Sequence, residues 1–239
     1  MAPTSLADLD RLPLPGACRE ALALSRSERI DGHTIAIAAD WWNAETAAAD
    51  PSASPVADPG VVRLRRGDLF TDAAGLAEGP DAELLRFLWQ VLAWGSGMRL
   101  RLNRKRIQAV ANDRSSALTV LRRALQAVDR KDPAGAYEAL HPGQRNAIAY
   151  LGPAFSTKVL YFAGGGAPGH ACVILDARVA ATLREACGWS SLGSTRWPTA
   201  TYVRYCELLQ RWAAEESARV GRPVGSDEIE RWLFSPLSD

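Results

Sequence analysis

The sequence predicts a mostly α-helical protein. From residue 81 onward, apolar residues recur at spacings of three and four, as they do on the buried face of a helix. No alternation with a period of two, which would indicate strands, extends over more than a few residues. Of the 239 residues, 47% are apolar and 23% are charged, so the chain can bury a real core and does not belong to the disordered class.

The first 80 residues are predicted to form an arm with little regular structure. Residues 17–42 allow two short helices, of which the second ends at Asp40-Trp41-Trp42. Residues 44–60 contain three prolines and mostly small side chains, so they predict a loop. Residues 61–70 allow a short strand or an irregular arm.

The helices predicted after residue 80 follow from their start and stop signals. Pro80 precedes the first, Ser115 and Ser116 are N-cap residues of the second, and glycines or an Asp-Pro pair follow several of the apolar runs. In order, the predicted helices run from Asp81 to a stop at Gly95-Ser96-Gly97, from Ser115 to a stop at Asp132-Pro133, and then over 134–151, 154–163, 176–187, 199–220 and 226–234.

The formal net charge of +1 hides one concentrated basic segment. Residues 99–131 carry 10 cations and 2 anions, whereas residues 1–98 carry 8 cations and 14 anions. Five of the cations lie between Arg99 and Arg106, where they predict either a solvated surface or contacts to phosphates with salt-dependent affinity. Asn103, between them, can hydrogen-bond a base or a backbone group.

Several functional classes are not expected. No apolar run approaches eighteen residues, and the N-terminus shows no secretory signal, so a cytoplasmic protein without a membrane span is predicted. The three histidines show no metal spacing, and neither a metal nor a cofactor is predicted. The four cysteines share no C-x-x-C spacing and are expected to be reduced thiols: Cys18, Cys172, Cys187 and Cys206.

The most informative segment runs from Tyr150 to Gly166. Gly152-Pro153 predicts a tight turn into a helix, whose first backbone N–H groups suit a phosphate. Lys158 follows one turn later among apolar neighbours, where desolvation favours the neutral amine that acts as a nucleophile. Asp176 follows an apolar run at a predicted helix start, where it can cap the helix and face a cavity. Each residue considered alone also has a purely structural interpretation: Lys158 as a surface lysine and Asp176 as the N-cap of a helix.

Together these residues resemble the helix-hairpin-helix DNA glycosylases, most of all the 8-oxoguanine (OGG-type) branch. Thr157-Lys158-Val159 is similar to the lysine-bearing helix of that family, Leu175 to Val179 is similar to its aspartate motif, and the separation of 18 residues also fits. Gly95-Ser96-Gly97 followed by Asn103 to Ile107 resembles bacterial OGG-fold proteins, some of which occur in anti-phage defence loci. The resemblance covers residues 145–190 most closely and extends to 84–130.

The resemblance implies a two-lobed helical fold with the catalytic pocket between the lobes. Residues 1–239 would form a single glycosylase-like domain. It would comprise an N-terminal arm (1–80), a helical lobe with the basic segment (81–135), and a hairpin-like catalytic region with the C-terminal helices (136–239).

The resemblance also implies an activity, that of a DNA glycosylase and AP lyase excising an oxidised or modified purine, such as 8-oxoguanine, from duplex DNA. Lys158 would attack the anomeric carbon and form a Schiff base, and Asp176 would orient or deprotonate the lysine. Trp232 and Phe234 would either line the base pocket or pack in the core. The residues expected to contact DNA are Arg99, Arg101, Asn103, Arg104, Lys105, Arg106, Gly152, Ser156, Thr157 and Arg178.

The hairpin departs from the family pattern, which has glycines four and two residues before the lysine. Here the two positions hold Ala154 and Ser156, which do not adopt a positive φ cheaply. The departure favours an alternative function: an OGG-fold module, catalytically altered, that binds a modified base, a nucleotide or a partner protein in a defence system. The presence of both Lys158 and Asp176 favours the enzyme. A helical scaffold without an active site is a third alternative, which leaves their spacing to coincidence.

Overall fold

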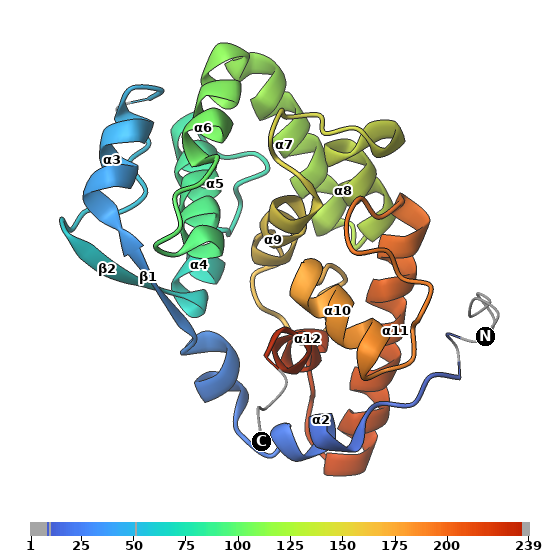
Figure 1. The fold of residues 1–239 in the computed structure, drawn as a ribbon. Coiled ribbons are helices and arrows are strands. Elements are labelled where there is room, and N and C mark those ends of the chain that lie inside the picture. Colours follow the sequence, from blue (N-terminus) through green and yellow to red (C-terminus); the bar gives the residue numbers. More distant parts are fainter. Residues whose placement is uncertain (1–8, 10, 51, 236–239) are drawn as a thin grey trace.

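The computed structural model describes residues 9, 11–50 and 52–235, and this part of the chain is mostly helical (Figure 1). The prediction of a mostly α-helical fold is therefore confirmed. Residues 1–8, where no secretory signal is expected, lie outside the described residues. Within the described residues, no helix combines the length and apolarity needed to cross a membrane.

The N-terminal part departs clearly from the predicted elements, because it contains a pair of strands. It holds the helix α2 (Gly16–Ala21), a π-helical turn η1 (Ser27–Asp31), the strand β1 (Thr34–Ala38), the helix α3 (Ala39–Ala47) and the strand β2 (Val61–Arg65). The two strands pair antiparallel, with Ile35 opposite Leu64. A helix ending at Trp42 was therefore wrong: residues 34–38 form a strand because β2 supplies their hydrogen-bond partners, and Trp41 and Trp42 lie inside α3.

Five helices follow: α4 (Arg66–Asp72), α5 (Asp81–Ser96), α6 (Asn103–Asn112), α7 (Arg114–Asp129) and α8 (Pro133–Leu140). The start of α7 is capped by Asp113, whose carboxylate accepts from Ser116 N, and not by a serine as predicted. The helix predicted over 134–151 ends at Leu140, because His141 leaves the helical conformation and Pro142 follows it. Residues 142–144 then form the short 3-10 turn η2 (Pro142–Gln144).

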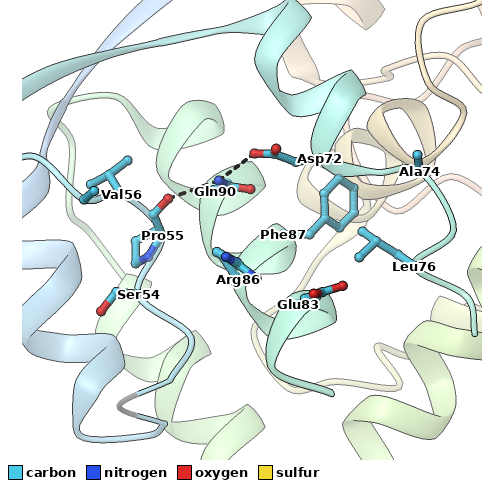
Figure 2. Close-up of a pocket in the computed structure, with 11 residues that line it drawn as sticks. Ser54, Pro55, Val56, Asp72, Ala74, Leu76, Glu83, Arg86, Phe87 and Gln90 are labelled. Carbon is cyan, nitrogen blue, oxygen red and sulfur yellow. Dashed lines mark hydrogen bonds between the residues drawn. The ribbon is translucent and has the colours of Figure 1, made fainter. Parts of the chain in front are cut away.

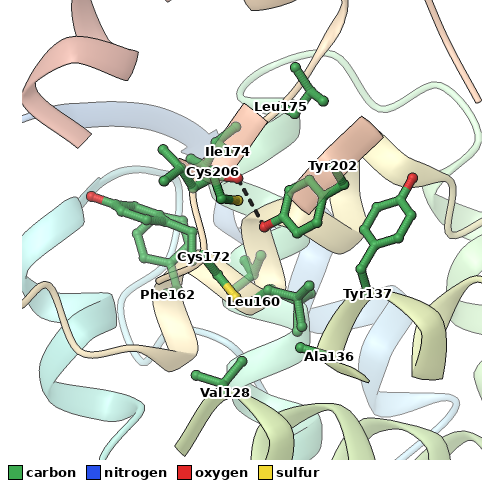
Figure 3. Close-up of a cluster of buried hydrophobic side chains, with 14 of the residues drawn as sticks. Val128, Ala136, Tyr137, Leu160, Phe162, Cys172, Ile174, Leu175, Tyr202 and Cys206 are labelled. Atoms are coloured by element: carbon green, nitrogen blue, oxygen red, sulfur yellow. Dashed lines mark hydrogen bonds between the residues drawn. The ribbon is translucent and has the colours of Figure 1, made fainter. Parts of the chain in front are cut away.

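The C-terminal helices lie close to their predicted positions. They are α9 (Pro153–Ala163), α10 (Ala177–Glu185), α11 (Thr199–Val220) and α12 (Ser226–Phe234). The helix α9 is central, and every residue from Ser156 to Phe162 is buried. Its apolar face packs into the cluster drawn in Figure 3, which joins Leu160 to Val128 of α7 and Tyr202 of α11. All four cysteines are buried free thiols.

Residues 172–175, just before α10, form no helix or strand, and two tyrosines of α11 hold them in place. Tyr202 donates its hydroxyl hydrogen to Val173 O (3.1 Å), and Tyr205 donates to Ile174 O (2.7 Å). These buried bonds satisfy backbone carbonyls that no helix or sheet serves. They fix the path of the chain that leads to Asp176.

His141 gives the fold a pH-dependent contribution to stability. Its side chain is buried, and burial lowers its pKa to about 4 against the raising effects of Asn146 and Glu138. Below its ordinary pKa of 6.5, the unfolded chain therefore binds a proton that the folded chain does not, and stability falls as the pH falls toward 4. We expect the free energy of unfolding to drop by about 2 kcal/mol between about pH 7 and pH 5 from this residue.

Chemical denaturation at both pH values, with His141→Asn in parallel, measures this contribution. The variant should lose less stability on acidification than the original protein does. An equal loss in both proteins would mean that His141 titrates normally in the folded state.

Candidate active site

One pocket brings together Lys158 and Asp176, the two residues on which the sequence prediction depends. The pocket measures about 370 Å³ and is lined by residues from β1, α4, α5, α9, α10 and α12. Its volume lies within the range of small-ligand sites. A larger pocket of about 550 Å³ lies beside α5, where Gln90 donates to Pro55 O and Asp72 (Figure 2). None of the residues predicted to be functional lines that larger pocket.

Lys158 projects from the second turn of α9 into the smaller pocket. Its side chain is 8% exposed, and its Nζ donates to Ala154 O (3.0 Å) and to Asp176 Oδ2 (3.1 Å). Gly95 provides the space, because a Cβ at this position would lie 2.9 Å from Lys158 Cδ. The helix α5 ends within Gly95-Ser96-Gly97 as predicted, with Ser96 as its last residue and Gly97 as its C-cap, and Gly95 in the last turn lets α9 approach.

Asp176 is both a helix cap and the partner of Lys158. Its Oδ1 accepts from the backbone N–H groups of Arg178 (3.0 Å) and Val179 (3.2 Å), which leaves Oδ2 for the amine. The register between the two residues is set by Thr157. Its Oγ1 both donates to Leu175 O and accepts from Leu175 N, each at 3.1 Å. The carboxylate consequently lies directly beside the amine, in a site with little access to water.

Some of the residues predicted to bind DNA do lie at the surface around the pocket. Arg99 and Arg178 line it, and both are exposed. Arg101 and Lys105 are exposed next to them in sequence, whereas the exposed Arg104 is ion-paired with Glu45. Gly152, the N-cap of α9, is half-buried.

The structure corrects the prediction for four other side chains, because they are buried and serve the fold. Asn103 donates to Ser96 Oγ (3.0 Å) and joins α5 to α6. Arg106 donates to Tyr150 O (3.1 Å) and stacks on Phe155, with 4.0 Å between its guanidinium carbon and the ring centroid. Two others bond to the backbone nearby, Ser156 to Leu151 O and Thr157 to Leu175. The sequence does not reveal their burial, because it depends on which elements pack over them.

The two predicted base-pocket aromatics are separated. Phe234 lines the pocket, and its ring contacts the Arg178 guanidinium at 4.7 Å. Trp232 does not line it: this side chain is buried, and it lines a separate pocket between α12 and the region of α2 and η1. The difference follows from the helix, since residues two apart point in nearly opposite directions.

Sequence reasoning missed the inner wall of the pocket. Arg66 of α4 and Glu230 of α12, both almost completely buried, form an ion pair with 3.2 Å between Arg66 Nη2 and Glu230 Oε2. Burial raises the pKa of Glu230 and lowers the pKa of neighbouring His33 to about 3, so this histidine is neutral. Trp94 stacks against the Arg66 guanidinium. No spacing signal joins these residues, which are scattered over both halves of the chain.

This inner wall also carries unused hydrogen-bonding capacity. Arg66 Nε, Trp94 Nε1 and His33 Nδ1 are buried without a hydrogen-bond partner among the described residues. An unsatisfied buried polar atom costs about 1–3 kcal/mol. A bound group with complementary atoms would recover part of that cost.

A second missed feature is a set of exposed apolar side chains outside the pocket lining. Leu102 is 42% exposed and Tyr150 is 48% exposed, and each adopts a positive φ (65° and 64°) that is uncommon for residues other than glycine. Met98 is also exposed, and Lys105 Nζ lies 5.5 Å from the centroid of the Tyr150 ring. The sequence did contain a signal for this feature, because Leu102 is an apolar residue inside a run of cations.

The described residues hold no group of three or more His, Cys, Asp or Glu side chains that could bind a metal. The pocket thus combines three features: the buried pair of Lys158 and Asp176, a polar inner wall, and arginines at its mouth.

One of three comparisons with known proteins finds a match for this chain. No curated protein and no solved structure matches the chain. A family model described as "Putative 8-oxoguanine DNA glycosylase OGG-like protein" matches residues 28–234. The match includes Lys158, Asp176, the basic segment and the pocket lining from His33 to Phe234. On this evidence the chain belongs to the OGG-like family, the family of 8-oxoguanine DNA glycosylase-like proteins.

Proposed function

We propose that this protein is a DNA glycosylase and AP lyase that removes an oxidised or otherwise modified purine from DNA. The observation that carries the proposal is the 3.1 Å contact between Lys158 Nζ and Asp176 Oδ2 inside a pocket of base-binding size. A nucleophile beside a base that is itself oriented, here by the N–H groups of α10, is the arrangement that covalent catalysis requires.

The proposed reaction begins with a proton transfer from Lys158 to Asp176 and ends with loss of the 3′ phosphate. Asp176 Oδ2 takes a proton from Lys158, and the free amine forms a bond to the anomeric carbon of the flipped nucleotide. The glycosidic C–N bond breaks, its electron pair leaves with the base, and the base takes up the proton that Asp176 had accepted. The Asp176 carboxylate is then negative again and stabilises the positive charge on the sugar. The sugar ring opens when its ring oxygen takes a proton from the Lys158 nitrogen, which leaves a Schiff base. Asp176 then removes a proton from C2′, and β-elimination breaks the C3′–O bond and expels the 3′ phosphate.

The surface around the pocket suits DNA. Arg99 and Arg178 at the mouth, with Arg101 and Lys105 near them, supply cations for phosphates. Flipping a nucleotide leaves a gap in the base stack, and apolar side chains commonly enter such gaps. We assign that role to Leu102 and Tyr150, whose apolar side chains are exposed.

The pocket lining suits a base with carbonyl groups. Phe234 offers a ring for stacking, and the unpartnered N–H groups of Arg66 and Trp94 are donors for oxygen atoms. An oxidised purine, which carries carbonyl oxygens for these donors, is therefore the favoured substrate class.

Borohydride trapping tests the proposal. Labelled duplexes carrying an 8-oxoguanine, an abasic site or no lesion are incubated with the original protein, with Lys158→Gln and with Lys131→Gln. We expect a covalent adduct on the first two duplexes with the original protein and with Lys131→Gln, because the exposed Lys131 follows α7 and does not line the pocket. Lys158→Gln should give no adduct while unfolding at a temperature close to that of the original protein.

The outcomes separate the enzyme from the alternative. An adduct on abasic DNA alone would establish the lysine chemistry and exclude 8-oxoguanine as the substrate. The absence of any adduct from folded protein would contradict the glycosylase and lyase reaction and leave an OGG-fold binding module.

A further inference from the structure

A second polar pocket lies at the start of α9, and it shares no lining residue with the Lys158 pocket. It measures about 300 Å³ and is formed by the end of α8, the η2 turn and the loop before α11. We call it the η2 pocket; its charged and polar lining consists of His141, Gln144, Arg145, Asn146 and Arg196. It contains two arginines and no carboxylate, so its lining is suited to an anion.

The two arginines are free to bind a ligand. The side chains of Arg145 and Arg196 are exposed and form no hydrogen bond or ion pair with another described residue. His141, by contrast, is only 2% exposed, and its Nε2 has no hydrogen-bond partner in the described part of the chain. A neutral imidazole can donate through Nε2, and a buried donor without a partner is a costly feature for a fold to keep. An anion held between the arginines would give that nitrogen a partner.

The loops that carry the arginines are held together from α8. Glu138 accepts from Gly143 N (3.0 Å) in one loop and from the Thr199 hydroxyl beside the other. Tyr137 donates to Trp197 O (2.8 Å). The carboxylate of Glu138 is thus engaged in fixing the loops, and it does not line the pocket.

Two of the lining residues have a backbone conformation that side chains disfavour. Gln144 has φ 65° and Arg196 has φ 55°. Such residues cost of order 1–3 kcal/mol each and cluster at binding sites. One of the two arginines is therefore presented by strained backbone, in a pocket whose loops are tied to one helix.

We propose that the η2 pocket binds a phosphate group of a nucleic-acid backbone. The choice of nucleic acid over another phosphate source rests on the proposed function. Pro153 lines the pocket, and the five residues from there to Lys158 rise about 7.5 Å along α9. Phosphates of one strand are spaced about 3.4 Å along the duplex axis, so the pocket suits a phosphate a few nucleotides from the target.

The site also accounts for the altered hairpin. Ala154 and Ser156 stand where flexible glycines would let the backbone approach a phosphate. Side-chain cations beside the same helix start supply the attraction in another way, and the positive end of the α9 dipole adds to it.

Salt-dependent duplex binding tests the proposal without any chemistry. The affinity for an undamaged duplex is measured over a range of salt concentrations for the original protein and for Arg145→Gln/Arg196→Gln. Because each neutralised phosphate contributes about 0.9 to the slope of log K against log salt, and the pocket is proposed to hold one phosphate, the slope should become shallower by about 0.9 in the double variant. Arg123→Gln/Arg130→Gln is the matched control, since these exposed arginines, in α7 and at its C-cap, line neither pocket.

A titration with inorganic phosphate, followed by the NMR signals of the His141 ring, locates the binding. Phosphate should shift these signals in the original protein but not in Arg145→Gln/Arg196→Gln. Shifts without a change in the duplex slope would overturn the backbone proposal in favour of free phosphate. No shift and no change in slope would overturn the site altogether.

Failure of the proposed function is distinguishable from failure of this site. If no borohydride adduct forms on abasic DNA but the double variant still loses salt dependence, the η2 pocket remains a backbone site on a non-catalytic protein. If the adduct forms and the slope is unchanged, the enzyme remains and the η2 pocket is not its phosphate site.

Discussion

Asp176→Asn is expected to slow the release of the modified base by about 10²–10⁴-fold while leaving the fold intact. Asparagine is as good an N-cap as aspartate, so it can still accept from the N–H groups at the start of α10. Its neutral amide can neither take a proton from Lys158 nor stabilise a positively charged sugar. Single-turnover assays on a duplex with 8-oxoguanine measure the rate, and thermal unfolding checks the fold.

Asp132→Asn is the matched control for this substitution. Asp132 caps α8, where its Oδ1 accepts from Gly135 N (2.9 Å), and it does not line the Lys158 pocket. The same chemical change at this cap should leave the rate unaltered. A rate for Asp176→Asn equal to that of the original protein would show that Asp176 is a cap and nothing more.

Breaking the Arg66–Glu230 ion pair is expected to have the largest effect on stability. Both side chains are about 1% exposed, and Arg66 also donates to the Tyr161 hydroxyl. Removing one partner from such a pair leaves a buried charge without compensation and costs about 3–5 kcal/mol. We expect Arg66→Met and Glu230→Met each to lose stability on this scale in chemical denaturation.

Two further variants test whether the loss comes from an unpaired buried charge: one removes both charges, and the other breaks an exposed ion pair. Arg66→Met/Glu230→Met removes both charges and should be more stable than the sum of the single losses allows, because neither charge is then left unpaired. Glu207→Met breaks the exposed pair with Arg204 and should cost at most about 1 kcal/mol. Losses of that small size at Glu230 would mean that water reaches the inner wall and compensates the charges.

The sequence allowed the prediction of elements whose signals are local. The bounds of α11 and α12 agree with the predicted helices, and α9 and α10 differ from them by one or two residues. Apolar spacing, a proline at the start and a glycine or aspartate cap lie within a few residues of each helix end. The strand β1 was missed for the opposite reason, since its hydrogen-bond partners come from β2, some 27 residues later in the chain.

The same division applies to the site. Lys158 and Asp176 could be named because their motif is contiguous and their spacing matches a known family. Asn103 and Arg106 were assigned to DNA from the charge of their segment, but α5 and α9 pack over them. Charge along a segment predicts that a surface is basic, and it does not predict which of its side chains the neighbouring helices cover.

The sequence by itself determined a helical fold, the lysine and aspartate pair and the basic segment, because each is written in residues close together in the chain. Only the tertiary structure decided the inner wall of Arg66 and Glu230, the separation of Trp232 from Phe234, and the η2 pocket of Arg145 and Arg196. These depend on contacts between distant elements, whose geometry is set by how whole helices pack. The pocket that the family motif requires is thus completed by residues that no motif contains.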